Sequence, residues 1–194
     1  MEVLLLPVEQ AARALLGARL VSTVGGLRAA GVIVEAEAYG GPDDPASHAA
    51  TRSGRTVRNG PMFGPAGTAY VYRSYGVHWC VNVVTGREGE PEAVLLRGIE
   101  PLEGLEVMEA RRDGRHPLAA GPGRLCQALG IDGALNRHDL REAPLRLEAG
   151  WEVPDRSVRV SGRVGVGAAA DLPLRFYVGG SVGVSRGPTP AENG

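Results

Sequence analysis

Residues 68–85 read TAYVYRSYGVHWCVNVVT and contain the two strongest strand patterns in the chain. Runs 68–74 and 77–85 are rich in β-branched and aromatic side chains, which favour extended strands. Only the corner at Tyr75 and Gly76 separates the two runs, and so short a connection is typical of an antiparallel hairpin. We therefore expect a hairpin here, with Tyr75 near its tip.

Shorter runs of Val, Leu and Ala on both sides of this hairpin predict further strands, and apolar residues at helical spacing predict three helices. The strands are expected at 19–23, 27–38, 93–99, 145–147, 158–160 and 174–178, and the helices at 8–16, 102–108 and 122–129. Together they predict an α+β fold with a mixed, mostly antiparallel curved sheet, flanking helices and a protruding hairpin. We expect one domain over residues 1–186 and a flexible tail over 187–194.

Composition excludes several classes of function. The 194 residues include no apolar run of the roughly 18 to 20 residues that span a bilayer, so we expect a cytoplasmic protein without a membrane partner. All 21 basic residues are arginine, which rules out a side-chain amine for Schiff-base catalysis. Cys80 and Cys126 match neither a disulfide framework nor a zinc site, and both are expected to be buried.

Charge is unevenly distributed along a chain whose formal net charge is only -1. No acidic residue lies between Asp44 and Glu88, yet five arginines do. A basic segment without acids favours a polyanionic partner such as nucleic acid. The five are Arg52, Arg55, Arg58, Arg73 and Arg87.

Glu37 is the first candidate for chemistry, because it ends a predicted strand beside Tyr39 and precedes an irregular loop that contains His48. A carboxylate in such a place can take a proton from water. A solvated acid on an edge strand is the plainer interpretation, and spacing alone leaves both open. Glu35 is expected on the same strand face, so a pair of carboxylates like that of glycoside hydrolases is a third possibility.

A metal site would need ligands that the spacing does not supply. Asp43, Asp44, His48 and His78 are of types that bind metals, but they follow no recognised ligand pattern. The two aspartates fit a turn, whose geometry they favour. We therefore expect neither a metal nor another cofactor.

A succession of short motifs runs through most of the chain, to about Ser185. They are Glu37-Ala38-Tyr39, Asp44-Pro-Ala-Ser-His48, Arg58-Asn59, Met62-Phe63, Tyr70-Val-Tyr72, Tyr75-Gly76, Asn82, Leu95-Leu-Arg97, Glu100-Pro101-Leu-Glu-Gly104, Gly121–Leu129 and Arg163-Val-Gly165-Val. In this order they resemble the mammalian-type alkyladenine (3-methyladenine) DNA glycosylase family.

The resemblance implies a monofunctional enzyme of DNA repair. Such an enzyme flips alkylated or deaminated purines out of duplex DNA and hydrolyses the N-glycosidic bond, leaving an abasic site. Glu37 is implied as the base that activates water, and Arg97 as a residue that helps hold the water and the backbone. The resemblance implies duplex DNA as the partner, and we also expect a monomer near the nucleoid with no obligate protein partner.

The resemblance also assigns the residues that hold the substrate. Tyr39, His48 and Tyr72 are implied as the walls that stack on the extruded base. Asn82 is implied as the residue that screens purines by crowding an exocyclic amino group, and Tyr75 as the one that fills the gap in the duplex. Phosphate contacts are expected from Arg52, Arg55, Arg58 and Arg73.

Two other functions remain open on the residues alone. The basic segment and Tyr75 would suffice for a nucleic-acid-binding module without catalysis, which would release no base from alkylated DNA. Glu35 and Glu37 would suffice for a hydrolase of nucleosides or small glycosides, which would act on mononucleosides and ignore duplex DNA.

Overall fold

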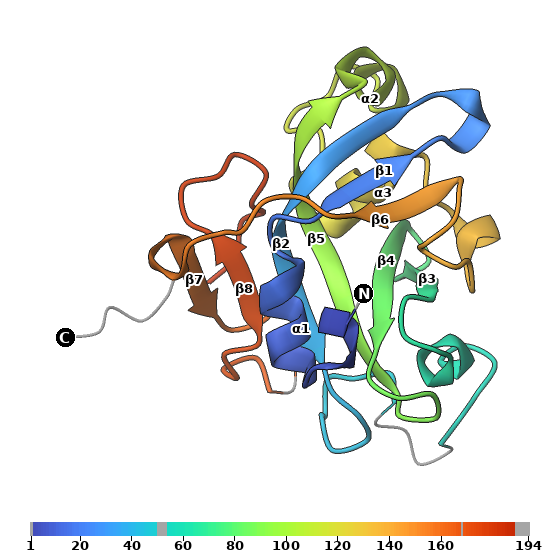
Figure 1. The fold of residues 1–194 in the computed structure, drawn as a ribbon, viewed down its shortest axis with the longest axis vertical. Coiled ribbons are helices and arrows are strands. Elements are labelled where there is room, and N and C mark those ends of the chain that lie inside the picture. The colour runs from blue at the N-terminus through green and yellow to red at the C-terminus, as the bar shows by residue number, and fades with distance from the viewer. Residues whose placement is uncertain (1, 50–53, 168, 189–194) are drawn as a thin grey trace.

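An eight-stranded sheet runs through the chain in this computed structural model, which describes residues 2–49, 54–167 and 169–188 (Figure 1). Its main path has the order β3-β4-β5-β2-β1-β6, while β8 pairs with both β2 and β7. The strands are β1 (Arg19–Ser22), β2 (Ala29–Tyr39), β3 (Ala69–Ser74), β4 (His78–Thr85), β5 (Glu92–Glu103), β6 (Leu145–Glu148), β7 (Val158–Ser161) and β8 (Arg175–Val178). The predicted curved sheet and α+β class are confirmed.

Every strand pairing among the described residues is antiparallel, so the prediction of a mixed sheet is wrong in that respect. The alternation that reveals a strand in sequence is the same for both directions of pairing. Whether two neighbouring strands pair parallel or antiparallel depends on the path of the chain that connects them. Here the long β2 and β5 lie antiparallel at its centre, and the β3–β4 hairpin extends it from β5.

In the described part of the chain, three α-helices and five short 3-10 helices accompany the sheet. The α-helices are α1 (Val8–Leu15), α2 (Leu105–Arg111) and α3 (Pro122–Leu129), and the 3-10 helices are η1 (Glu2–Leu5), η2 (Val24–Gly26), η3 (Gly60–Phe63), η4 (Gly133–Leu135) and η5 (Asp155–Ser157). None of the helices in the described ranges has the length and apolar character needed to cross a bilayer.

The helix expected at 102–108 begins later than predicted. β5 continues to Glu103 because the first residues of β2 pair with it there, Ala30 opposite Glu103. The strand ends just before Gly104, whose φ of 69° lies in the left-handed region. Strand pairing along the eleven residues of β2 therefore outweighs the helical spacing of Leu102.

Alternation along β3, β4 and β5 sorts their side chains onto two faces. One face joins the main core, into which α1 also places its apolar stripe and α3 its buried residues. The strands contribute Ala69, Val71, Val81, Val83, Val94 and Leu96 to that core. The opposite face of the same strands carries Tyr70, Tyr72, Cys80, Asn82, Leu95 and Arg97, all of which line a cleft.

An irregularity in β2 places its two acids on the cleft side. The register with β5 shifts on both sides of Glu35, so that Ile33 and Ala36, three residues apart, both enter the main core. A bulge of this kind changes the face to which the following side chains point. Glu35 and Glu37 consequently share the side that faces Arg97 of β5.

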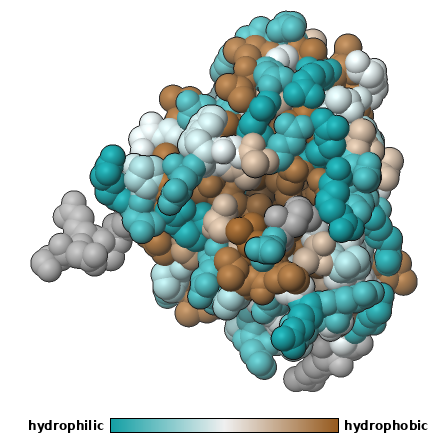
Figure 2. All heavy atoms as spheres, viewed as in Figure 1, coloured by the Kyte–Doolittle hydropathy of each residue, from teal (hydrophilic) through white to brown (hydrophobic). Residues whose placement is uncertain are grey.

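Apolar side chains gather on the face that carries the N-terminus, over η1 and α1 (Figure 2). The exposed large apolar side chains of the molecule include Leu5, which is 63% exposed, and Trp151, which is 56% exposed. Both lie outside the set of residues that line the large cleft.

Candidate active site

A cleft of about 1630 Å³ opens over the polar face of β3, β4 and β5. Its other walls come from the loop after β2, the connection between α2 and α3, and the segments around Val164 and Ser185. Among the described residues that line the cleft there are six arginines and three histidines, but no aspartate or glutamate. Such a surface attracts polyanions.

Aromatic side chains form one wall of the cleft. The ring of His48 lies edge-on to Tyr72 at 4.6 Å, and Tyr70 lies 5.2 Å from Tyr72 between ring centroids. His48 Nδ1 is 2.8 Å from the Tyr70 hydroxyl. Burial, together with the charge of Arg58, lowers the pKa of His48, so the imidazole is neutral at pH 7.

The tyrosines of this wall stay protonated. Burial raises the pKa of Tyr70 to about 12, and burial also raises the pKa of Tyr72 well above its ordinary value. Tyr39, which lines the same cleft, has a raised pKa because it is buried and lies beside Glu37. The wall is therefore uncharged at neutral pH, apart from the Arg58 guanidinium 5.4 Å from the Tyr72 ring.

Glu37 lies directly behind the residues of the cleft wall, with its side chain fully buried. Its Oε1 accepts a hydrogen bond from the Val164 amide at 2.7 Å. Its Oε2 accepts one from the Tyr39 hydroxyl at 2.9 Å and one from Arg97 at 3.4 Å. Burial raises the pKa of Glu37, and these three donors lower it only in part. The result is a positioned carboxylate that takes up a proton more readily than a free one.

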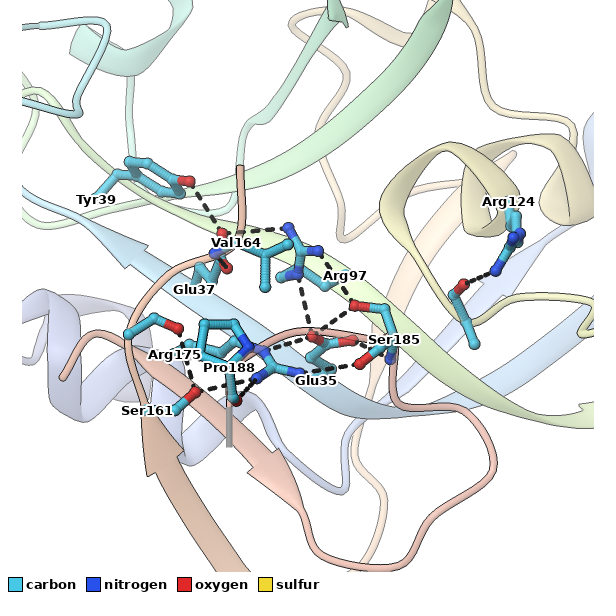
Figure 3. A network of polar contacts seen from close by, with 12 residues as sticks. Glu35, Glu37, Tyr39, Arg97, Arg124, Ser161, Val164, Arg175, Ser185 and Pro188 are labelled. Carbon is cyan, nitrogen blue, oxygen red and sulfur yellow. Dashed lines mark hydrogen bonds and ion pairs between the residues drawn. The ribbon is translucent and has the colours of Figure 1, made fainter. Parts of the chain in front are cut away.

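Glu35, two residues earlier, has a different environment (Figure 3). Its Oε1 accepts from Arg97 Nε at 3.1 Å, from Arg175 Nε at 2.7 Å and from the Ser185 hydroxyl at 2.9 Å. Its Oε2 accepts from the Ser185 amide at 2.7 Å. The hydrogen bonds of this buried carboxylate are thus directed to protein groups, and its two guanidinium partners balance its charge.

Arg97 joins the two acids. Besides Glu35 and Glu37, it donates from Nη2 to the Ser185 hydroxyl at 3.1 Å. Burial alone would lower the pKa of Arg97, but the charges of Glu37 and Glu35 outweigh it and raise that pKa. The guanidinium is therefore a fixed positive charge beside the Glu37 carboxylate.

A further buried ion pair ties the loop after β2 to the segment that holds Glu37. Arg163 is 1% exposed and donates to both carboxylate oxygens of Asp44, at 2.6 and 2.8 Å. Its guanidinium also lies 4.7 Å from the Tyr39 ring centroid. Val164 directly follows Arg163 in the chain. The Arg163–Asp44 pair therefore fixes the position of the loop after β2 and also of the Val164 amide that binds Glu37. Asp44, weighed in the sequence as a metal ligand, is thus engaged by arginine.

The remaining predicted substrate residues lie on the floor and rim of the cleft. Asn82 is 4% exposed, and its side-chain amide donates to the Tyr70 carbonyl at 2.9 Å. Tyr75 is 90% exposed at the turn between β3 and β4. Its φ of 50° and the φ of 70° at Gly76 lie in the left-handed region, which a bulky residue rarely adopts.

The predicted phosphate-binding arginines divide into two groups. Arg58 lines the cleft. Arg55 and Arg73 are exposed outside it and stack on Phe63 at 5.5 Å and on Trp79 at 5.4 Å. Arg52 lies outside the described residues.

Several groups at the site were not predicted. Ser185 and Arg175 come from the last part of the chain, and Arg163 was noted only within a motif, without a role. Val164 acts through its backbone amide, which no side-chain pattern reveals. The arginines between α2 and α3 that line the cleft could have been found from their clustering, since 111–115 reads RRDGR.

Comparison with known proteins identifies a family and several relatives of this chain. A family model described as "Methylpurine-DNA glycosylase (MPG)" matches residues 2–182. A protein of Methanoculleus marisnigri is 54% identical over 162 residues, which covers 81% of this chain and 83% of the relative. One of Myxococcus xanthus is 49% identical over 189 residues (96% and 92%), and one of Agrobacterium fabrum 48% over 177 residues (90% and 86%).

All three relatives carry the name "Putative 3-methyladenine DNA glycosylase". The family match extends over nearly the whole chain and includes every strand and the cleft residues up to Gly167, while the cleft segment around Ser185 lies just beyond it. The chain belongs to the methylpurine-DNA glycosylase family and is a DNA glycosylase, a hydrolase of N-glycosyl bonds.

Proposed function

We propose that this protein flips alkylated purines such as 3-methyladenine out of duplex DNA and hydrolyses their N-glycosidic bond with a water activated by Glu37. The supporting observation is a fully buried carboxylate, held by three donors, directly behind the aromatic wall of a basic cleft. Family membership supplies the reaction class, and the geometry of Glu37 supplies the base.

The base-binding wall suits a cationic purine. An N-alkylated purine carries positive charge, which is attracted to the faces of electron-rich rings by about 0.5 to 2 kcal/mol per good contact. Tyr72 and Tyr39 supply such rings. The lowered pKa of His48 keeps the imidazole neutral, so it adds no repulsion. Asn82, fixed by its bond to the Tyr70 carbonyl, is positioned to crowd an exocyclic amino group.

Water activation needs an ionised carboxylate with a free lone pair. Arg97 favours the ionised form of Glu37, while burial makes the same group basic enough to accept a proton. The anion also balances positive charge that develops on the sugar as the base leaves. Glu35 acts as a positioning residue in this scheme, because it holds Arg97 through Nε.

Tyr75 is the residue proposed to enter the duplex when the base leaves it. A bulky residue with positive φ and 90% exposure gains nothing for the fold, and backbone strain of this kind often marks a functional position. Insertion of a flat side chain between base steps compensates for stacking lost on flipping. Protrusion of the hairpin, action on deaminated purines and a monomeric state belong to the same proposal.

The alternatives account for less of the site. A hydrolase that used both acids would need Glu35 free to act, but this carboxylate accepts four hydrogen bonds from Arg97, Arg175 and Ser185. A binding module without catalysis would have no use for a buried carboxylate with a raised pKa. Release of free base from alkylated duplex DNA separates catalysis from binding alone.

The decisive experiment replaces Glu37 by its neutral isostere. Glu37→Gln should lower single-turnover excision of 3-methyladenine by at least about a hundredfold, the usual scale for a lost general base, while leaving lesion binding nearly unchanged. Asp43→Asn is the matched control, since it removes one negative charge from the exposed loop after β2. Excision by Glu37→Gln within a few fold of that control would overturn the assignment.

A further inference from the structure

The connection between α2 and α3, together with the first turn of α3, brings three arginines to the wall of the cleft. Arg112 follows the last residue of α2, Arg115 lies three residues later, and Arg124 lies in the first turn of α3. All three line the cleft, and all lie outside the basic segment between Asp44 and Glu88. Figure 3 shows Arg124 and the start of α3 on the far side of Arg97 from Tyr39.

The three guanidinium groups repel one another. Burial lowers the pKa of Arg112, and the charges of Arg115 and Arg124 lower it further. Asp113 opposes this effect, but its carboxylate pairs with Arg115 at 2.7 Å in an exposed position. Glu109, the other acid nearby, lies 3.7 Å from His116. Charges of one sign held this close favour the binding of an anion.

Arg112 has hydrogen-bonding capacity left over. It is only 7% exposed, and its Nη1 donates to Gln127 Oε1 in α3. Its buried Nε has no partner among the described residues. A buried donor of a charged group is rarely left unpaired in a folded protein, so the unpaired Nε is a second sign that a ligand belongs here.

The first turn of α3 adds backbone donors. Pro122 occupies the first helical position and has no N–H, while the Gly121 amide donates to the Arg97 carbonyl at 2.9 Å. The amides of Gly123 and Arg124 have no acceptor within the helix, because first-turn donors never do. Together with the helix dipole they form the kind of site that binds phosphate.

The hairpin packs directly against this turn. A Cβ added at Gly123 would lie 3.0 Å from both Cβ and Cγ of His78, so glycine permits the close approach. His78 pairs with Ser74, the residue before Tyr75. The arginines and the hairpin tip therefore lie along one wall of the same cleft.

We propose that Arg112, Arg115, Arg124 and the first-turn amides of α3 bind a phosphate of the DNA backbone beside the flipped nucleotide. The proposal rests on the proposed function, since it takes duplex DNA as the partner. It assigns this site to anchoring the strand while Tyr75 enters the duplex, and it gives the site no part in bond cleavage.

Salt dependence of binding tests the site without disturbing the buried Arg112. In Arg115→Gln/Arg124→Gln, the slope of log K against log salt should become shallower by about 0.9, the value for one lost phosphate contact. Affinity should fall equally for damaged and undamaged duplex. The matched control is Arg141→Gln/Arg156→Gln, which removes two exposed charges outside the cleft, one of them paired with Asp139 as Arg115 is with Asp113.

A scan with neutral methylphosphonates locates the phosphate. One position near the lesion should weaken binding by the wild-type protein but cause no further loss in Arg115→Gln/Arg124→Gln. The site would be overturned if the salt slope of Arg115→Gln/Arg124→Gln were unchanged, or if the control variant lost as much slope. It would also be overturned if every methylphosphonate position weakened binding by this variant as much as it weakens binding by the wild type. Single-turnover excision by the wild-type protein at saturating enzyme is measured in parallel. Absence of excision by the wild type would refute the proposed function, whereas the slopes would still decide the phosphate site.

Discussion

At the scale of single residues, two acids two positions apart have different hydrogen-bond partners and therefore different electrostatic environments. Glu35 is bound by two guanidinium groups and both polar groups of Ser185. Glu37 has one guanidinium partner at 3.4 Å, an amide and a hydroxyl. The weaker neutralisation leaves burial as the dominant influence, which raises the pKa of Glu37.

The raised pKa predicts the acid side of the pH profile. In the proposed mechanism excision requires ionised Glu37, so the rate should fall about tenfold per pH unit below its pKa, and the midpoint should lie above the ordinary value of 4.5. Single-turnover rates from pH 4 to 9 measure this limb, with Asp43→Asn as the control that should not move it. A midpoint at or below 4.5 contradicts the prediction.

The same shift makes a prediction about stability. Between 4.5 and the raised pKa of Glu37, the folded state binds more protons than the unfolded one, so the free energy of unfolding should decrease as pH rises through this window. Glu37→Gln should remove that decrease. Urea unfolding of both proteins at several pH values measures the difference, and identical pH dependence would show that Glu37 is not shifted.

At the scale of elements, the segment from 181 to 188 holds the site from outside the main sheet path. Ser185 binds both Glu35 and Arg97, and Arg175 donates to the carbonyls of Ser185 and Pro188. The segment reaches this place because glycines allow it to approach β5. A Cβ at Gly183 would lie 2.4 Å from the Ile99 carbonyl oxygen, and one at Gly98 would lie 2.1 Å from the Gly183 carbonyl oxygen.

Gly183→Ala should therefore displace this segment and loosen Arg97. We expect excision to fall by about a hundredfold, as for a misplacement of about 1 Å, with a stability loss of about 1 to 3 kcal/mol from overpacking. Gly41→Ala is the control, because a Cβ there meets nothing within 4 Å. Thermal unfolding and single-turnover excision measure the two effects, and wild-type behaviour of Gly183→Ala would show that the segment does not position Arg97.

At the scale of the whole molecule, the absence of lysine limits what the enzyme does after base release. Cleavage of the strand at an abasic site through a Schiff base needs a neutral amine. Arginine remains protonated at any working pH and cannot replace it. All 21 basic residues are arginine, so no side-chain amine is available, and the α-amino group at the N-terminus of the chain is the amine left to consider.

We therefore expect an intact strand with an abasic site as the product. Borohydride added during turnover should trap no protein on the DNA, as judged by denaturing gels. Should a covalent complex appear, comparison with a chain acetylated at its N-terminus would show whether the terminal amine formed it. A trapped complex that disappears on acetylation would refute the monofunctional assignment.

The sequence by itself predicted the strands and the helices in the α2–α3 region. It also shows directly the basic segment without acids and the absence of lysine. These features depend on alternation, turn chemistry and composition, which neighbouring residues carry by themselves. The motif order likewise determined the family. The extent of β5 was missed because Leu102 and Glu103 extend the strand only through partners some seventy residues away in β2.

Only the tertiary structure decided which groups bind each of the two acids at the site. The shift of register at Glu35 turns both acids toward Arg97, and Ser185, 150 residues from Glu35, then engages the first acid. Val164 binds the second through its backbone. The arginines of the α2–α3 connection join the cleft because α3 packs against β4 and β5. Contacts of this kind depend on strand register and on how distant segments pack, and no local pattern of side chains records either of them.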